Sequence, residues 1–255
     1  MAIIKTAKEI ELLAEGGKIL ADILHTVAAA VKPGVSTLDL DHLAREEMKK
    51  FGVKPAFEGY RMGNQGPKYP AVLCSSVDHE VVHGIPSHKK ILKEGQIIGL
   101  DLGIIHKELY TDSALSVAVG KASKENEKLL RVTREALEAG IAQVRPGNKI
   151  GDIAHAIQSC AKKAGFAVIR DLIGHGVGHE LHEKPDVPNY GRAGTLEELM
   201  PGMVIAIEPM FTRGDWRITF LDDGWTVVTA DGSPSAHFEH TVAVTTAGHK
   251  VLTAK

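Results

Sequence analysis

Two segments of the chain resemble each other at an offset of 113 positions (144 − 31), and this repeat constrains the fold more than any other feature. The first runs from Val31 to Val53 and the second from Val144 to Phe166. The matched pairs are Pro33 and Pro146, Gly34 and Gly147, Asp39 and Asp152, His42 and His155, Lys49 and Lys162, Lys50 and Lys163, and Gly52 and Gly165. A period this long indicates two related halves and not a solenoid.

Each repeat follows a long stretch in which apolar residues recur at helical spacing, over 10–27 in the first half and 129–141 in the second. Thr6 begins a capping box before the first stretch, and Ser123 is a candidate N-cap for the second. We expect a shorter helix after each Pro-Gly pair, over 37–51 and 150–164. Because helix–Pro–Gly–helix patterns are common, chance remains the alternative explanation of the repeat.

Stretches rich in β-branched residues follow each helix pair. We expect strands over about 71–77, 96–105, 113–119, 203–211, 226–230 and 238–244. The chain then reads as one α+β domain, 1–255, with halves of about 6–120 and 121–250. Helices lie outside and sheet inside, and a site would lie between the halves.

The overall composition is that of a soluble globular protein. The net charge of -2 gives no reason to expect nucleic acid or a membrane surface as a partner. Cys74 and Cys160 form neither a disulfide framework nor a metal-binding pair. The N-terminus has no apolar signal core, and no apolar run reaches transmembrane length. We therefore expect a cytoplasmic protein.

Four carboxylates fall on or beside apolar strand patterns, two in each half. Asp101 lies in "GLDLG" and Asp112 opens "DSALSV"; Glu208 lies in "IAIEPM" and Glu239 in "HFEHTVAV". A turn near 106–108 would fold the two aspartates back against each other. A carboxylate in an apolar strand is costly unless it is paired or bound to a cation. One such residue usually finds an arginine or a backbone donor, whereas four together favour two divalent ions.

The segment "IGHGVGHELHEKP" contains His175, His179 and His182. A zinc protease helix needs HExxH, but His182 comes one position early, and the glycines oppose a helix. They suggest backbone that turns tightly beside a ligand or a strand. His83, in "EVVHGIP", resembles His182, since we expect each to end a strand before a turn that leads to a proline. A surface turn is the alternative for either histidine alone.

Taken together, the motifs "HGIP", "DLG…TDSA", "GHGVGHELHEKP", "IEPM" and "FEHTVAV" resemble those of the type I methionine aminopeptidases in order and spacing. The resemblance covers essentially the whole chain. It implies the pita-bread α+β fold, two pseudo-symmetric halves with a central antiparallel sheet and outer helices. It also implies removal of the initiator methionine from nascent proteins whose second residue is small.

The resemblance further assigns roles to individual residues. It implies that the metal ligands are Asp101, Asp112, His175, Glu208 and Glu239, with Asp112 and Glu239 bridging two ions. It implies catalytic roles for His83, His182 and Glu208. In that chemistry the ions share a water and lower its pKa, and Glu208 shuttles the proton. His182 stabilises the oxyanion and His83 binds the scissile amide, while His179 has no catalytic role.

Oxygen-rich ligation with one imidazole suits cobalt, manganese or iron(II) better than a structural zinc site, and zinc stays open as a catalytic ion. The resemblance implies that the methionine pocket is lined by Phe57, Tyr60, Tyr69, Cys74, Leu181 and Trp225. An ordinary core role is the alternative for these residues, above all for Phe57. Phe57 and Leu181 depart from the family's usual cysteine and phenylalanine, and the loop 60–70 looks longer than usual.

An Xaa-Pro aminopeptidase or prolidase on the same fold is the rival enzyme, although those enzymes usually carry an additional N-terminal domain. A binding protein on an inactive scaffold, or a metal-free creatinase-like hydrolase, would lack the five ligands. The chain resembles the short bacterial form. We expect a monomer that acts on N-terminal methionine peptides and nascent chains, with a transient ribosome contact, no nucleic-acid specificity and no membrane.

Overall fold

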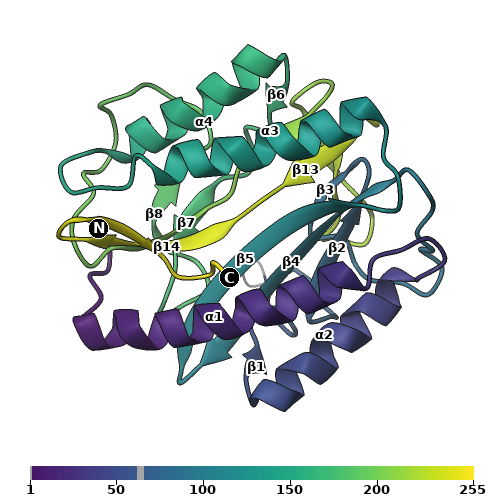
Figure 1. Cartoon of the computed structure of the whole chain (residues 1–255), viewed down its shortest axis with the longest axis horizontal. Coiled ribbons are helices and arrows are strands. Elements are labelled where there is room, and N and C mark those ends of the chain that lie inside the picture. The colour runs from purple at the N-terminus through teal and green to yellow at the C-terminus, as the bar shows by residue number, and fades with distance from the viewer. Residues whose placement is uncertain (1, 62–65) are drawn as a thin grey trace.

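The computed structural model describes residues 2–61 and 66–255. Its helices form two consecutive pairs, each followed by strands. The helices are α1 (Ala7–Ala29), α2 (Thr37–Phe51), α3 (Lys124–Ile141) and α4 (Ile150–Ala164). Figure 1 shows the α1–α2 pair below and the α3–α4 pair above the strands that join them. The four helices match the expected stretches.

Local capping explains where the helices begin. Thr6 Oγ1 accepts a hydrogen bond from the backbone of Glu9, and the Glu9 carboxylate accepts one from the backbone of Thr6, so the capping box at α1 is confirmed. Ser123 caps α3 as expected. The aspartates of the repeat have the same role as Glu9. Asp39 in α2 and Asp152 in α4 each accept a hydrogen bond from the backbone N–H of the N-cap residue.

The strands form four antiparallel sheets within residues 2–61 and 66–255. The first sheet contains β1 (Lys54–Pro55), β4 (Ile97–His106), β2 (Leu73–Val77) and β5 (Leu109–Ala118). The second has the order β15 (Gly248–Val251), β14 (His240–Thr245), β9 (Val204–Ile207), β7 (Gly174–Gly176) and β8 (Glu183–Val187). Two three-stranded sheets are β13 (Ser235–His237), β10 (Met210–Thr212) and β6 (Ala167–Val168), and β11 (Ile218–Phe220), β12 (Val227–Thr229) and β3 (Glu80–Val82).

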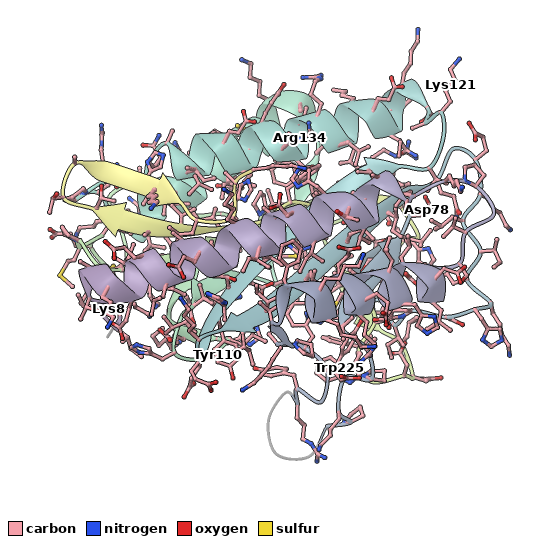
Figure 2. All side chains as sticks on the ribbon, turned by 60° about the horizontal axis from the view of Figure 1, so that its bottom comes forward. Lys8, Asp78, Tyr110, Lys121, Arg134 and Trp225 are labelled. Carbon is pink, nitrogen blue, oxygen red and sulfur yellow. The ribbon has the colours of Figure 1, made fainter. Side chains whose placement is uncertain are left out.

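A separate hydrophobic core lies under each helix pair. Leu20 and Leu24 of α1 pack with Leu100 of β4 in one core, and Ile153 of α4 packs with Phe211 of β10 in the other. These side chains are almost completely buried. Figure 2 shows Arg134 of α3 on one side of the molecule and Trp225 on the opposite side. The cores thus fix the helices outside the strands.

Three of the differences from the expected strands change where a carboxylate lies relative to a strand. Asp112 lies within β5, which begins earlier than expected. The expected strand 203–211 is broken at Glu208 because Pro209, which follows it, has no N–H for a ladder. Glu239 precedes β14; its backbone N–H instead donates to Ala114 of β5 at 2.8 Å.

Hydroxyl side chains join β5 to the C-terminal strands. Thr241 Oγ1 donates to the Asp112 carbonyl at 2.7 Å and accepts from the Asp112 N–H at 3.0 Å. Ser113 and Ser116 donate to the carbonyls of Glu239 and His237, both at 2.8 Å. All are buried, so these bonds fix the two halves against each other where the carboxylates lie. No helix among the described residues combines the length and hydropathy that a membrane span requires.

Candidate active site

A tight hairpin brings the two aspartates together. Lys107 and Glu108 both have positive φ, which closes a two-residue turn where one was expected. In the β4–β5 register Asp101 pairs with Ala114 and Asp112 with Gly103. The aspartates are therefore two residues apart on adjacent strands, and their side chains lie on one face. Both are buried.

The second half brings its ligand candidates to the same place. His175 lies in the middle of β7, Glu208 lies at the break between β9 and β10, and Glu239 directly precedes β14. One ligand atom each of Asp112, His175 and Glu239 lies within 4.8 Å of the others. Asn189 holds the Glu208 carbonyl at 3.0 Å. The site therefore contains side chains from both halves.

The clustered carboxylates repel one another in a water-poor environment. Burial, followed by the charge of Asp112, raises the pKa values of Asp101, Glu208 and Glu239. Burial raises the pKa of Asp112 to about 7. Without a nearby positive charge, these carboxyl groups would keep protons at neutral pH. A bound cation would allow them to ionise.

A divalent metal ion fits this set of residues. Within the described parts of the chain, no group donates a hydrogen bond to Asp101 Oδ1, Asp112 Oδ1 or Glu239 Oε1, and all three atoms are buried. Buried acceptors without partners are rare in proteins unless a cation or water satisfies them. Manganese, iron, cobalt and zinc can each be bound by carboxylate oxygens together with one imidazole nitrogen.

His175 already has the orientation that a metal ligand needs. Its Nδ1 lies 2.9 Å from the carbonyl of Gly176 and donates to it, which leaves the Nε2 lone pair free. Nε2 points at Glu208, 3.6 Å from Oε1. Burial lowers the pKa of His175 to about 3, so the ring is neutral at pH 7. A neutral imidazole with a fixed tautomer can bind a cation.

His182 and His83 lie beside this cluster. The His182 ring centroid is 4.3 Å from that of His175, and the Tyr60 hydroxyl is 2.6 Å from His182 Nδ1. Burial lowers the pKa of both His182 and His83 to about 4, so both are neutral. His83 follows the end of β3, as expected, with a left-handed φ of 58°. His182 precedes β8 and does not end a strand, because the glycine-rich segment turns before pairing resumes.

A cavity of ≈ 80 Å³ opens beside the carboxylates. Apolar and aromatic side chains form its other wall; they are Phe57, Tyr60, Tyr69, Cys74, Leu181 and Trp225. These are the six residues named from the sequence. Phe57 is both core and wall, since it is buried and lines the cavity. The expected long loop 60–70 includes Met62–Gln65, which lie outside the described residues. A wider groove of ≈ 470 Å³ continues from His83, His182 and Glu208 toward solvent.

Two histidines stand apart from the expected set. His179 does not line the cavity; its ring is partly exposed and lies 2.7 Å from Glu9 on the surface. His237 was missed and does line it, with Nε2 3.6 Å from Glu208 Oε2. Burial lowers the pKa of His237 to about 3. The available signal was its spacing, two positions before Glu239, which places both side chains on one face of extended chain.

Together, the fold and the site define a pita-bread metallopeptidase. The model of metallopeptidase family M24 matches residues 11–246. A methionine aminopeptidase of Aquifex aeolicus is 48% identical over 248 residues, 96% of each chain. The structure of a methionine aminopeptidase from Thermotoga maritima superposes with a TM-score of 0.96 at 47% identity and full coverage of both chains.

This chain belongs to metallopeptidase family M24, within its methionine aminopeptidases. Prolidases have the same fold with lower similarity. The Pyrococcus horikoshii prolidase has a TM-score of 0.77 at 22% identity, and the match covers 64% of that chain. The fold expected from the sequence is confirmed.

Proposed function

We propose that the protein hydrolyses the bond after an N-terminal methionine in peptides and nascent chains whose second residue is small. One observation carries the proposal: an apolar, aromatic cavity opens directly beside the buried carboxylates and His175. A flexible thioether fits such a wall, and the reacting bond would lie next to the cluster.

The five ligand candidates would hold two divalent ions. Asp112 and Glu239 would bridge them, Asp101 would complete one shell, and His175 with Glu208 the other. When bound, the ions would polarise the scissile carbonyl and lower the pKa of the attacking water. The orphaned oxygens of Asp101, Asp112 and Glu239 support this assignment.

Glu208 would take the proton of the attacking water and return it to the leaving amine. Its carboxylate lies between the two imidazoles of His175 and His237, in reach of the cavity. Burial raises the pKa of Glu208, so it holds a proton more readily than a surface glutamate does. A carboxylate that binds a proton more readily than usual suits general acid–base catalysis.

His182 would stabilise the oxyanion by donating a hydrogen bond from Nε2. Burial raises the pKa of Tyr60, so its phenol stays protonated. The Tyr60 hydroxyl then donates a hydrogen bond to His182 Nδ1. The neutral ring then carries its own proton on Nε2. His83 Nδ1 is buried, with no hydrogen-bond partner within the described chain, and would bind the scissile amide.

The substrate assignment is tested with matched peptides. We expect Met-Ala-Ser to be hydrolysed with added manganese or cobalt at least about 100-fold faster than Leu-Ala-Ser or Ala-Pro-Ser, since loss of a fitted side chain costs a few kcal/mol. Release of the free amino acid is followed by chromatography. Equal or faster cleavage of Ala-Pro-Ser would replace the assignment with an Xaa-Pro activity.

The setting of this activity is also proposed. The protein would act as a cytoplasmic monomer that meets nascent chains at the ribosome; the two free cysteines support only the reducing compartment. A single catalytic domain, 1–255, with halves of about 6–120 and 121–250, accounts for ligand candidates that come from both halves.

A further inference from the structure

A buried ion pair joins the N-terminal segment to the segment that carries His182. Lys5 Nζ contacts Glu183 Oε2, and both side chains are only 1% exposed. The two residues are 178 positions apart in the chain. Charges are rarely buried this completely, because removing them from water is costly unless their geometry is well satisfied. The described residues contain no other ion pair as deeply buried on both sides.

The Glu183 carboxylate also organises the segment 178–183 from within. Its second oxygen, Oε1, accepts hydrogen bonds from the backbone of His179 at 2.5 Å and of Glu180 at 3.0 Å. The Gly178 N–H donates to the Glu180 carbonyl at 3.1 Å. The turn therefore closes around one carboxylate, and Leu181 and His182 lie between these anchor points.

Lys5 is itself held from the opposite side. Its backbone N–H donates to the Gly202 carbonyl at 2.8 Å. Gly178 has a φ of 143°, and a Cβ there would lie 2.5 Å from Lys5 Cε. A Cβ at this position would displace the lysine stem, and the positive φ also favours glycine. The aliphatic part of Lys5 packs against Gly178, and its ammonium group pairs with Glu183. Both the length and the charge of Lys5 therefore contribute to the contact.

We propose that Lys5 is a positioning residue for catalysis, which acts through Glu183 to hold His182, and with it Leu181, at the substrate cavity. The inference rests on the proposed function, since it assumes that His182 acts on the substrate. Lys5 is not among the described residues that line the cavity. Its effect is transmitted by the turn, because His182 directly precedes Glu183 in the chain.

The surface contact between His179 and Glu9 cannot replace this pair. The His179 side chain is 40% exposed and that of Glu9 is 29% exposed, so water competes for the bond. The ion pair between Lys5 and Glu183 is shielded from water. It also includes the carboxylate that accepts the backbone hydrogen bonds of the turn.

The experiment is a double-mutant cycle between Lys5 and His182, with methionine release from Met-Ala-Ser as the readout. We expect Lys5→Met, which keeps the stem and removes the charge, to lower kcat about ten-fold with a smaller change in KM, because the anchored ring is displaced. In the His182→Ala background, Lys5→Met should change kcat by less than about two-fold. Assays are run well below the unfolding midpoint of each variant.

A second measurement does not depend on activity. In metal-free protein, Lys5→Met should speed amide hydrogen exchange in 178–183 about ten-fold, since this segment loses its anchor. Ile153→Val, in the core under α4, is the control for loss of stability alone and should leave exchange there and kcat unchanged. Lys5→Met alone leaves Glu183 as an unpaired buried charge and could fail to fold. In that case the double variant Lys5→Met/Glu183→Gln, which removes both charges of the pair, replaces it in both experiments with the same expected results.

Additive effects of the Lys5 and His182 substitutions, or wild-type exchange in 178–183, would overturn the positioning role and leave methionine release intact. Failure of the wild-type protein to release methionine would instead overturn the proposed function. The two failures are distinguishable because the wild-type assay and the metal-free exchange measurement are independent.

Discussion

Asp112 affects the protonation of three neighbouring carboxyls in the site. Its backbone is hydrogen-bonded on both sides by Thr241, so its carboxylate has a fixed position among Asp101, Glu208 and Glu239. Its charge contributes to the raised pKa values of those three residues. In metal-free protein, the ionised cluster therefore opposes folding at neutral pH.

Asp112→Asn should stabilise the metal-free protein and flatten its pH dependence. The histidines are the same in both proteins, so a difference in pH dependence between the variant and the wild type reports the carboxyls. The folded-state pKa of Asp112, about 7, exceeds its unfolded value, so the stability from its bound proton is lost as pH rises through 7. We expect the variant to gain about 1–3 kcal/mol in free energy of unfolding at pH 8. Urea denaturation after chelation, from pH 6.5 to 8, measures it; a slope as steep as wild type would contradict the expectation.

Individual site residues were predictable to different degrees. A carboxylate in an apolar run is unusual enough that Asp101, Asp112, Glu208 and Glu239 could be chosen from the sequence. Lys5 could not, because its partner is 178 residues away and no local pattern marks it. The roles of all these residues remain predictions.

At the scale of elements, many of the repeated residues cap the ends of α2 and α4. Asp39 and Asp152 occupy the third position of α2 and α4, where a carboxylate accepts the N-cap N–H. Gly52 and Gly165 end the same helices in the left-handed conformation, with φ of 67° and 81°. The helices could be predicted because these signals are local.

Gly165→Ala should destabilise the protein through backbone strain alone. A Cβ at Gly165 would meet nothing within 4 Å, so no clash contributes. The left-handed conformation costs an L-residue about 1–2 kcal/mol, and reduced freedom in the unfolded chain offsets part of this. We expect a net loss of about 1 kcal/mol in free energy of unfolding by urea denaturation. Gly165→Asn, which tolerates this conformation, is the control and should lose less; an alanine variant as stable as wild type would refute the cap.

The strands were harder to predict than the helices because their ends depend on distant partners. The break at Glu208 follows from Pro209, which is visible in the sequence, but the pairing of Glu239 with Ala114 of β5 is not. Short strands such as β7 lack any periodic pattern, since they contain only three residues. Long-range pairing, and not local propensity, decides such segments.

At the scale of the whole molecule, the site lies where the halves meet. Asp101 and Asp112 come from the β4–β5 hairpin, and His175, Glu208 and Glu239 from strands that follow α4 in the chain (Figure 1). The repeat predicted two halves with a site between them, but the sequence could not show which hydroxyls join β5 to the C-terminal strands. A cation bound by these ligands would therefore link both halves of the molecule.

Metal removal should accordingly lower the stability of the entire fold and not of one segment. A ligand held at 100 times its Kd stabilises a protein by about 2.7 kcal/mol. For a chain of this size, that corresponds to a fall in Tm of about 5–10 °C on chelation. Scanning calorimetry of manganese-loaded and chelated protein measures this, and we expect one cooperative transition in both. The control is Asp112→Asn, whose Tm should respond little to chelation because a bridging ligand candidate is lost. Two separate transitions on chelation, or an unchanged wild-type Tm, would show that bound metal does not join the halves.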